Sequence, residues 1–92
     1  MLWLVCYDVA DDRRRLKLVK QIEKRCQRVQ RSVFECPLDE PMLVRQLERY
    51  WLPLLNLEED NLRVYPLDAT AKIRTRVFGS PRPYEPPDFM IL

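Results

Sequence analysis

The chain begins with an almost unbroken hydrophobic run, which extends from Leu2 to Val9. Aliphatic and aromatic residues fill this run, as is typical of a central strand that is buried on both faces. Asp8 is the only charged residue in it and lies near its carboxyl end. A carboxylate at Asp11 or Asp12 can cap a helix, because it accepts hydrogen bonds from free N–H groups of the first turn. The pattern therefore predicts a buried strand that leads directly into a helix.

Two stripes with helical spacing follow, and they predict a helix that ends near Gln27. The apolar stripe consists of Leu16, Val19, Ile22 and Cys26. The basic stripe consists of Arg13, Lys17, Lys20, Lys24 and Arg28. The two stripes lie on different faces, so the helix is expected to pack on a sheet and to present a row of cations outward.

The middle of the chain predicts an extended segment and a second helix. Residues 28–38 have extended character and can form either one bent strand or a very short hairpin. Asp39 is predicted to cap a helix that has Pro41 near its first position, where proline is tolerated. Pro53 is expected to end that helix.

Residues 62–67 and 72–78 are each predicted to form a strand. Two helices interleaved with four or five strands indicate an α+β fold, the ferredoxin-like plait (split βαβ). In this fold an antiparallel sheet carries two helices on one face. A core of this size is thin, so association with a partner subunit is expected.

The end of the chain is proline-rich and then wholly apolar. We therefore divide the chain into a domain at residues 1–79 and a proline-rich tether with a C-terminal edge strand at residues 80–92. The apolar end is expected to add to the sheet of a dimer partner. Folding back onto its own subunit and pairing with another protein are the alternatives.

The net charge of +2 conceals an uneven distribution. Residues 13–31 hold nine Lys/Arg and one Glu, which gives +8, whereas residues 1–12 and 32–92 each carry −3. A positive block of this density predicts a polyanionic partner, and nucleic acid is the first candidate. The alternative is an ordinary solvated helix face.

Histidine is absent from the whole sequence, and there are three cysteines, Cys6, Cys26 and Cys36. The absence of histidine excludes Cys/His zinc sites and histidine-based triads, so any general base is a carboxylate, a metal hydroxide or water. An odd cysteine count without a CxxC spacing favours reduced thiols that pack as small hydrophobes, as in a cytoplasmic protein. The N-terminal apolar run lacks a basic segment before it, so a signal peptide is not expected, and neither is a membrane span.

Three stretches together resemble the small CRISPR-associated spacer-acquisition subunit, the Cas-two family of endoribonucleases. They are Leu4-Val5-Cys6-Tyr7-Asp8-Val9, Asp12-Arg13-Arg14-Arg15, and Arg28-Val29-Gln30-Arg31-Ser32-Val33-Phe34-Glu35-Cys36. A fourth stretch, Asp60-Asn61-Leu62-Arg63-Val64-Tyr65-Pro66-Leu67, is similar to the family's penultimate strand. The similarity spans roughly residues 2–67 in consistent order and spacing. Family members often carry a glycine where this chain has Cys26-Gln27.

The resemblance implies a homodimeric, metal-dependent phosphodiesterase that acts on RNA or DNA. It implies that Asp8 is the catalytic residue and the ligand of Mg²⁺ or another divalent cation such as Mn²⁺. It also implies assembly with the larger CRISPR integrase subunit, and in some members the small subunit acts as a catalytically silent scaffold. Without the resemblance, Asp8 would be interpreted as a strand-end residue that caps the adjacent loop.

The remaining candidate residues are cations and their neighbours in the recognisable segments. Those expected to contact nucleic acid are Arg13, Arg14, Arg15, Lys17, Lys20, Lys24, Arg28 and Arg31, with Arg74 and Arg76 as extensions. Arginines suit phosphate because they donate two parallel hydrogen bonds. Tyr7, Ser32 and Phe34 are supporting residues. Ser32 has no base to activate it as a nucleophile, and Phe34 is better explained by core packing.

Overall fold

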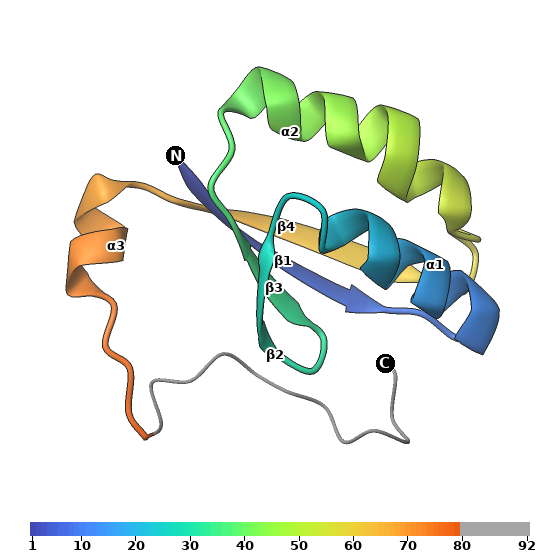
Figure 1. Ribbon diagram of the computed structural model, residues 1–92, viewed down its shortest axis with the longest axis horizontal. Helices are drawn as coiled ribbons and strands as arrows, with labels where there is room; N and C mark the ends of the chain where they lie inside the picture. Colours follow the sequence, from blue (N-terminus) through green and yellow to red (C-terminus); the bar gives the residue numbers. More distant parts are fainter. Residues whose placement is uncertain (80–92) are drawn as a thin grey trace.

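The computed structural model describes residues 1–79 of the chain and has the architecture that the pattern predicts (Figure 1). Its elements are β1 (Leu2–Asp8), α1 (Asp12–Ile22), β2 (Gln27–Gln30), β3 (Val33–Cys36), α2 (Glu40–Gln46), a π-helical turn (Leu47–Trp51), a 3₁₀ turn (Leu52–Leu54), β4 (Asn61–Leu67) and α3 (Ala69–Arg74). The sheet has the order β2-β3-β1-β4, and every pair of neighbours is antiparallel. This order is the split βαβ arrangement of the ferredoxin-like plait. The predicted tether and edge strand at 80–92 lie outside the described residues.

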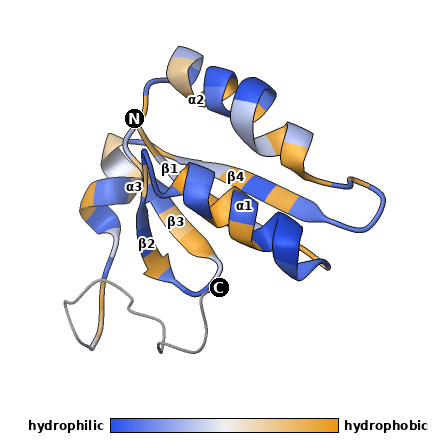
Figure 2. Ribbon diagram, turned by 45° about the vertical axis from the view of Figure 1, so that its right-hand side comes forward, coloured by the Kyte–Doolittle hydropathy of each residue, from blue (hydrophilic) through white to orange (hydrophobic). Residues whose placement is uncertain are grey.

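One face of the sheet is covered by α1 and α2, and the core lies between the layers (Figure 1). Val5, Phe34 and Trp51 are completely buried there, as are Leu18 and Ile22 of α1. Figure 2 shows that α1 carries both hydrophobic and hydrophilic residues, as an amphipathic helix on a sheet should. Burying a side chain of this size stabilises the fold by roughly 1.5–3 kcal/mol, so this interface is the main source of stability.

The opposite face of the sheet is not covered by any element of the described chain. Along β1, buried residues alternate with half-buried ones, so Leu4 and Cys6 lie on this open face while Val5 faces the helices. The ladder places Tyr65 opposite Leu4 and Arg63 opposite Cys6. The prediction that the first strand is buried on both faces is therefore wrong for one subunit. The strand is central in the sheet, but its residues alternate between buried and half-buried because helices cover only one face of the sheet.

The extended segment at 28–38 forms a hairpin, which decides between the two predicted alternatives. Strands β2 and β3 are joined at Arg31 and Ser32, and a register shift lies between Arg28 and Gln30. The helix before this hairpin ends at Ile22 instead of near Gln27, because the chain turns at once to enter β2. The buried face of α1 includes Leu18, whereas the spacing of apolar residues predicted Leu16 in that stripe.

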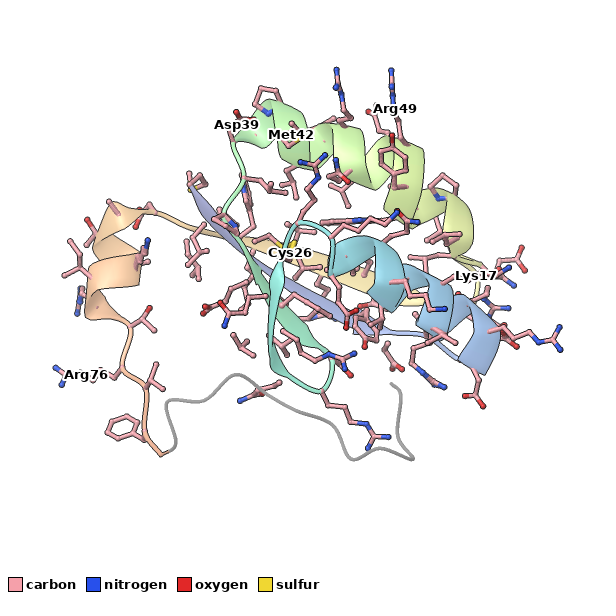
Figure 3. The ribbon with its side chains drawn as sticks, viewed as in Figure 1. Lys17, Cys26, Asp39, Met42, Arg49 and Arg76 are labelled. Atoms are coloured by element: carbon pink, nitrogen blue, oxygen red, sulfur yellow. A yellow bond between two sulfur atoms is a disulfide. The ribbon has the colours of Figure 1, made fainter. Side chains whose placement is uncertain are left out.

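Cys26 and Cys36 form a disulfide, so the expectation that all three cysteines are reduced is wrong (Figure 3). The hairpin explains the pairing. Gln27 lies opposite Glu35 in the ladder, and the next pair outward is Cys26 and Cys36, whose Cα atoms are 4.3 Å apart. An odd number of cysteines did not exclude this bridge, since it leaves Cys6 as the free thiol.

The predicted N-cap of the second helix is confirmed, since the Asp39 carboxylate accepts a hydrogen bond from the Met42 N–H at 2.8 Å. The helical path continues through the π and 3₁₀ turns and finishes just after Pro53. By contrast, the strand predicted at 72–78 is wrong. Asp68 caps the short helix α3 there by accepting from the Ala71 N–H at 2.7 Å, and the residues after it are irregular. None of the helices described in residues 1–79 is both long and apolar enough to cross a bilayer.

The disulfide closes a short loop around the β2–β3 hairpin, which gives a stability prediction. Replacing Cys26 by Ser should lower the free energy of unfolding by about 2–3 kcal/mol, because the bridge no longer restricts the unfolded chain. Urea denaturation of the oxidised protein measures this change. Cys6→Ser is the matched control, because that cysteine is free and only half-buried. Equal stability of the two variants would contradict the prediction.

Candidate functional site

Asp8 is the last residue of β1, and its side chain is exposed. The ladder pairs it with Asn61, the first residue of β4. A small open pocket of about 180 Å³ lies beside it and is lined by Tyr7, Asp8, Val9, Arg15, Arg31 and Ser32. The structure therefore brings together five of the residues that the sequence analysis singled out, from β1, the start of α1 and the β2–β3 turn.

Arg15 reaches this pocket because α1 starts directly after the strand. Its guanidinium donates to the Val9 carbonyl oxygen at 3.3 Å and forms an ion pair with Asp12. The first of these contacts holds the guanidinium against the carboxyl end of β1. Arg31 is exposed at the tip of the hairpin and also lines the pocket. Two arginines thus line the same pocket as the Asp8 carboxylate, which suits a phosphate group near that carboxylate.

Tyr7, Arg28 and Phe34 hold the hairpin tip against β1. The Tyr7 hydroxyl donates to the Arg31 carbonyl oxygen at 3.1 Å and accepts from the Arg28 guanidinium at 3.3 Å. That guanidinium also lies over the Phe34 ring, 5.2 Å from its centroid. Phe34 is completely buried, which confirms core packing as its role. The prediction that Arg28 extends the exposed basic stripe is wrong, because only 8% of the residue is exposed.

The exposed part of the basic stripe consists of Arg13, Lys17, Lys20 and Lys24. Figure 3 shows Lys17 projecting from α1 away from the sheet. The two cations considered as extensions, Arg74 and Arg76, are exposed but belong to α3 and the residues after it, at the opposite end of the view in Figure 1. They do not continue the α1 stripe.

Arg14 points away from the pocket, toward the loop before β4. Its Nε donates to the Asp60 carboxylate at 2.9 Å, and its Nη2 lies 2.6 Å from the Glu59 carboxylate. These hydrogen bonds, first that to Asp60, raise the pKa of Arg14 above its ordinary value. Arg14 therefore does not line the pocket with Arg15, and its charge is paired with two acids.

Asp60 is a residue that the sequence analysis missed. Its side chain is fully buried, and its carboxylate accepts from the Ala10 N–H at 3.0 Å and the Asn56 N–H at 2.8 Å, besides Arg14. These bonds, led by the one from Arg14, lower the pKa of Asp60 to about 2. In the sequence, Glu58-Glu59-Asp60-Asn61 indicates only an acidic turn before a strand. The feature of the sequence that could have identified Asp60 is its position directly before the strand that pairs with Asp8.

The carboxylate of Asp8 is the one metal-ligating side chain in the pocket. Within residues 1–79, no three His, Cys, Asp or Glu side chains lie close enough together to hold a metal ion. Mg²⁺ is commonly held by one or two carboxylates, with water and substrate phosphate completing its shell. The Asp8 carboxylate and the nearby Ser32 hydroxyl fit a cation bound in this open manner, and they do not form a closed cage.

The buried Asp60 carboxylate makes a prediction about acid stability. Its pKa of about 2 in the folded protein is below the value of about 3.9 in an unfolded chain, so the group stabilises the fold fully above about pH 4. This contribution is lost as the pH falls from about 4 to 2. Asp60→Asn should therefore lower the melting temperature by several degrees at pH 7, and the difference from wild type should shrink toward pH 2. Urea or thermal denaturation across this range tests the prediction, and a pH-independent difference contradicts it.

Comparison with known proteins places the chain in a family. The family model described as "CRISPR associated protein Cas2" matches residues 1–75. The CRISPR-associated endoribonuclease Cas2 2 of Synechocystis sp. is 62% identical over 90 residues, which is 98% of this chain and 97% of that protein.

Two solved structures share the fold. The crystal structure of Streptococcus pyogenes Cas2 is 32% identical with a TM-score of 0.71, and covers 86% of this chain and 100% of that one. A chain of a partial Cas6-RT-Cas1–Cas2 complex is 37% identical with a TM-score of 0.72, and covers 83% of this chain and 88% of its own. The match to the family model, the identity to the relative and the shared fold agree: this chain belongs to the CRISPR-associated Cas2 family.

Proposed function

We propose that this protein is a nuclease subunit of CRISPR spacer acquisition, which hydrolyses phosphodiester bonds of RNA or DNA with a divalent cation at Asp8. The observation that carries the proposal is the pocket that the exposed Asp8 carboxylate lines together with Arg15 and Arg31. A carboxylate and two guanidinium groups in one pocket suit a metal-bound phosphate, because the cations neutralise the phosphate while the carboxylate holds the metal. The names of the relatives, endoribonuclease and Cas2, agree with this chemistry.

Each residue of the pocket has a separate task in the proposed reaction. Asp8 holds Mg²⁺ or Mn²⁺, and the cation supplies a bound water of lowered pKa as the source of hydroxide. This source matters here because the chain has no histidine to act as a general base. Arg15 and Arg31 orient the phosphate, and Tyr7 fixes the hairpin tip that carries Arg31. Ser32 completes the wall of the pocket.

The protein is proposed to act as a homodimer through the open face of the sheet. This face carries half-buried apolar side chains, with Leu4 and Cys6 at its centre on β1. Burial already raises the pKa of the Cys6 thiol, which is typical of an apolar setting. Asp8 belongs to the same face at the end of the strand, so a two-fold dimer presents this carboxylate twice.

The integrase subunit and nucleic acid are the proposed partners. The structural neighbour solved in a complex contains Cas1 together with Cas2. On this chain the exposed cations Arg13, Lys17, Lys20 and Lys24 offer a continuous row for a phosphate backbone. The proposed place of action is the cytoplasm, where the invading nucleic acid lies.

The second candidate function is a catalytically silent scaffold that bridges integrase subunits and holds DNA. The observation that favours it is the single carboxylate in the pocket, since the described residues contain no cluster of three or more metal-ligating side chains. A scaffold needs the basic row and the dimer surface but not Asp8. The two functions therefore differ in what they require of that residue.

Asp8→Asn separates the two functions. The substitution keeps the shape of the side chain and removes the charge that binds metal, so cleavage should fall about 100-fold or more while the dimer persists. The assay measures cleavage of single- and double-stranded RNA and DNA with Mg²⁺, Mn²⁺ or EDTA. Glu48→Gln in the π-helical turn after α2 is the matched control, because its exposed side chain loses the same charge and does not line the pocket. Equal cleavage by Asp8→Asn and wild type would contradict the metal-ligand role, and absence of cleavage in both would favour the scaffold.

The exposed basic row predicts how the affinity for nucleic acid changes with salt concentration. Lys17→Ala/Lys20→Ala/Lys24→Ala should weaken binding to all nucleic-acid sequences alike, because each phosphate contact releases counterions and carries no sequence information. The slope of log affinity against log salt should fall by roughly 0.7–0.9 for each contact removed. Fluorescence anisotropy over a salt series measures this slope. Arg45→Ala/Arg49→Ala/Lys72→Ala removes equal charge elsewhere and should change the slope less; an equal change would contradict the assignment of the row.

A further inference from the structure

The buried Asp60 carboxylate joins two loops that the sequence places far apart. One of its oxygens accepts from the Ala10 N–H at 3.0 Å and from Arg14 at 3.2 Å. The other accepts from the Asn56 N–H at 2.8 Å and the Arg14 Nε at 2.9 Å. All four donors converge on a side chain with no exposed surface. Such a group defines the relative position of its donors, because a buried carboxylate that loses one of them is left with an unsatisfied acceptor.

Two contacts, one from Asp60 and one from its neighbour Asn61, lie directly around Asp8. Ala10 is two residues after Asp8 in the chain, and its N–H is held by Asp60. Asn61, the residue after Asp60, is the ladder partner of Asp8 itself. The end of β1 is thus held by adjacent residues of one loop, through the β-ladder at Asp8 and through the carboxylate at Ala10.

A third contact leads to the cation in the pocket. Arg14 lies in the first turn of α1 and pairs with Asp60, and Arg15 follows it in that turn. Arg15 points to the other side of the helix start, where it contacts the Val9 carbonyl oxygen and lines the pocket with Asp8. Anchoring Arg14 therefore sets the rotation of the helix start, and this rotation directs Arg15 toward the pocket.

We propose that Asp60 is a positioning residue for the metal and phosphate site: it fixes Asp8 and Arg15 in one geometry through Ala10 and Arg14. This role rests on the proposed metal-binding function of Asp8. It also explains why the chain uses an arginine in the basic block for an internal ion pair. Arg14 helps to position the site, whereas the neighbouring cations bind the ligand.

The chemistry of the site distinguishes aspartate from its nearest substitutes. Asparagine offers one acceptor oxygen, and its amide N–H groups would face donors, so Asp60→Asn removes both charge and acceptors. Glutamate keeps the charge and both oxygens but is longer by one methylene in a fully buried site. Asp60→Glu therefore changes position without changing charge, whereas a purely electrostatic role for Asp60 would survive it.

The test measures Mn²⁺ binding to the full chain by electron paramagnetic resonance, together with amide hydrogen exchange at Ala10. Asp60→Glu and Asp60→Asn should each raise the Mn²⁺ dissociation constant about 10-fold, the size expected when the support of a metal ligand is disturbed. Both should also increase the exchange rate of the Ala10 amide.

Leu43→Ala is the control for destabilisation, because Leu43 is a buried core residue of α2 outside the site. It should lower the melting temperature without changing Mn²⁺ affinity or Ala10 exchange at 25 °C. Wild-type Mn²⁺ affinity in Asp60→Glu, unchanged Ala10 exchange, or an equal loss of affinity in Leu43→Ala would each overturn the proposal. If wild type binds no Mn²⁺, the proposed metal-binding function of Asp8 fails. In that case, faster exchange of the Ala10 amide in Asp60→Glu than in Leu43→Ala still supports the positioning role of Asp60. Equal exchange in the two variants overturns that role.

Discussion

The pairing of β1 with two neighbours is the constraint on which the rest of the structure depends. β1 is hydrogen-bonded to β3 on one side and to β4 on the other, and its buried residues belong to the core that packs against both helices. A strand held on both sides has a fixed register, so its last residue has a fixed place. That residue is Asp8, and the start of α1, the β2–β3 turn and the loop before β4 all meet beside it. The candidate site is a consequence of where the central strand ends.

The basic block shows how burial divides residues that look equivalent in a sequence. Arg14 is taken up by an ion pair with Asp60, and Arg28 packs over the Phe34 ring. Lys17 and the other lysines of α1 remain exposed. Arginine suits the internal positions because its planar group donates several hydrogen bonds in fixed directions and stacks on rings, whereas lysine is a strongly hydrated point charge. This difference explains why the internal positions of the block hold arginine, while Arg13 and Arg31 stay exposed with the lysines.

Most of the fold could be predicted from periodicity, whereas its exceptions come from contacts between distant residues. The first strand, both main helices and the Asp39 cap follow from local patterns. The disulfide depends on the hairpin register, which places Cys26 opposite Cys36. Residues 72–78 alternate like a strand, but the local cap at Asp68 turns their start into a helix. Asp8 was predicted from the resemblance of its segment to a known family, whereas Asp60 was missed because two of its donor residues, Ala10 and Arg14, lie in another loop and a helix.

The one-sided burial of the sheet connects the fold to assembly. The helices use one face completely, so the apolar side chains on the other face gain nothing from a single subunit. A small domain gains stability by covering such a face with a second copy, since the unfolded surface it buries alone is limited. The same face ends at Asp8, where the pocket opens and the cations gather. In the proposed dimer, a partner on this face would add stability and set the distance between two Asp8 carboxylates in one step, which would link the oligomeric state to the proposed chemistry of the site.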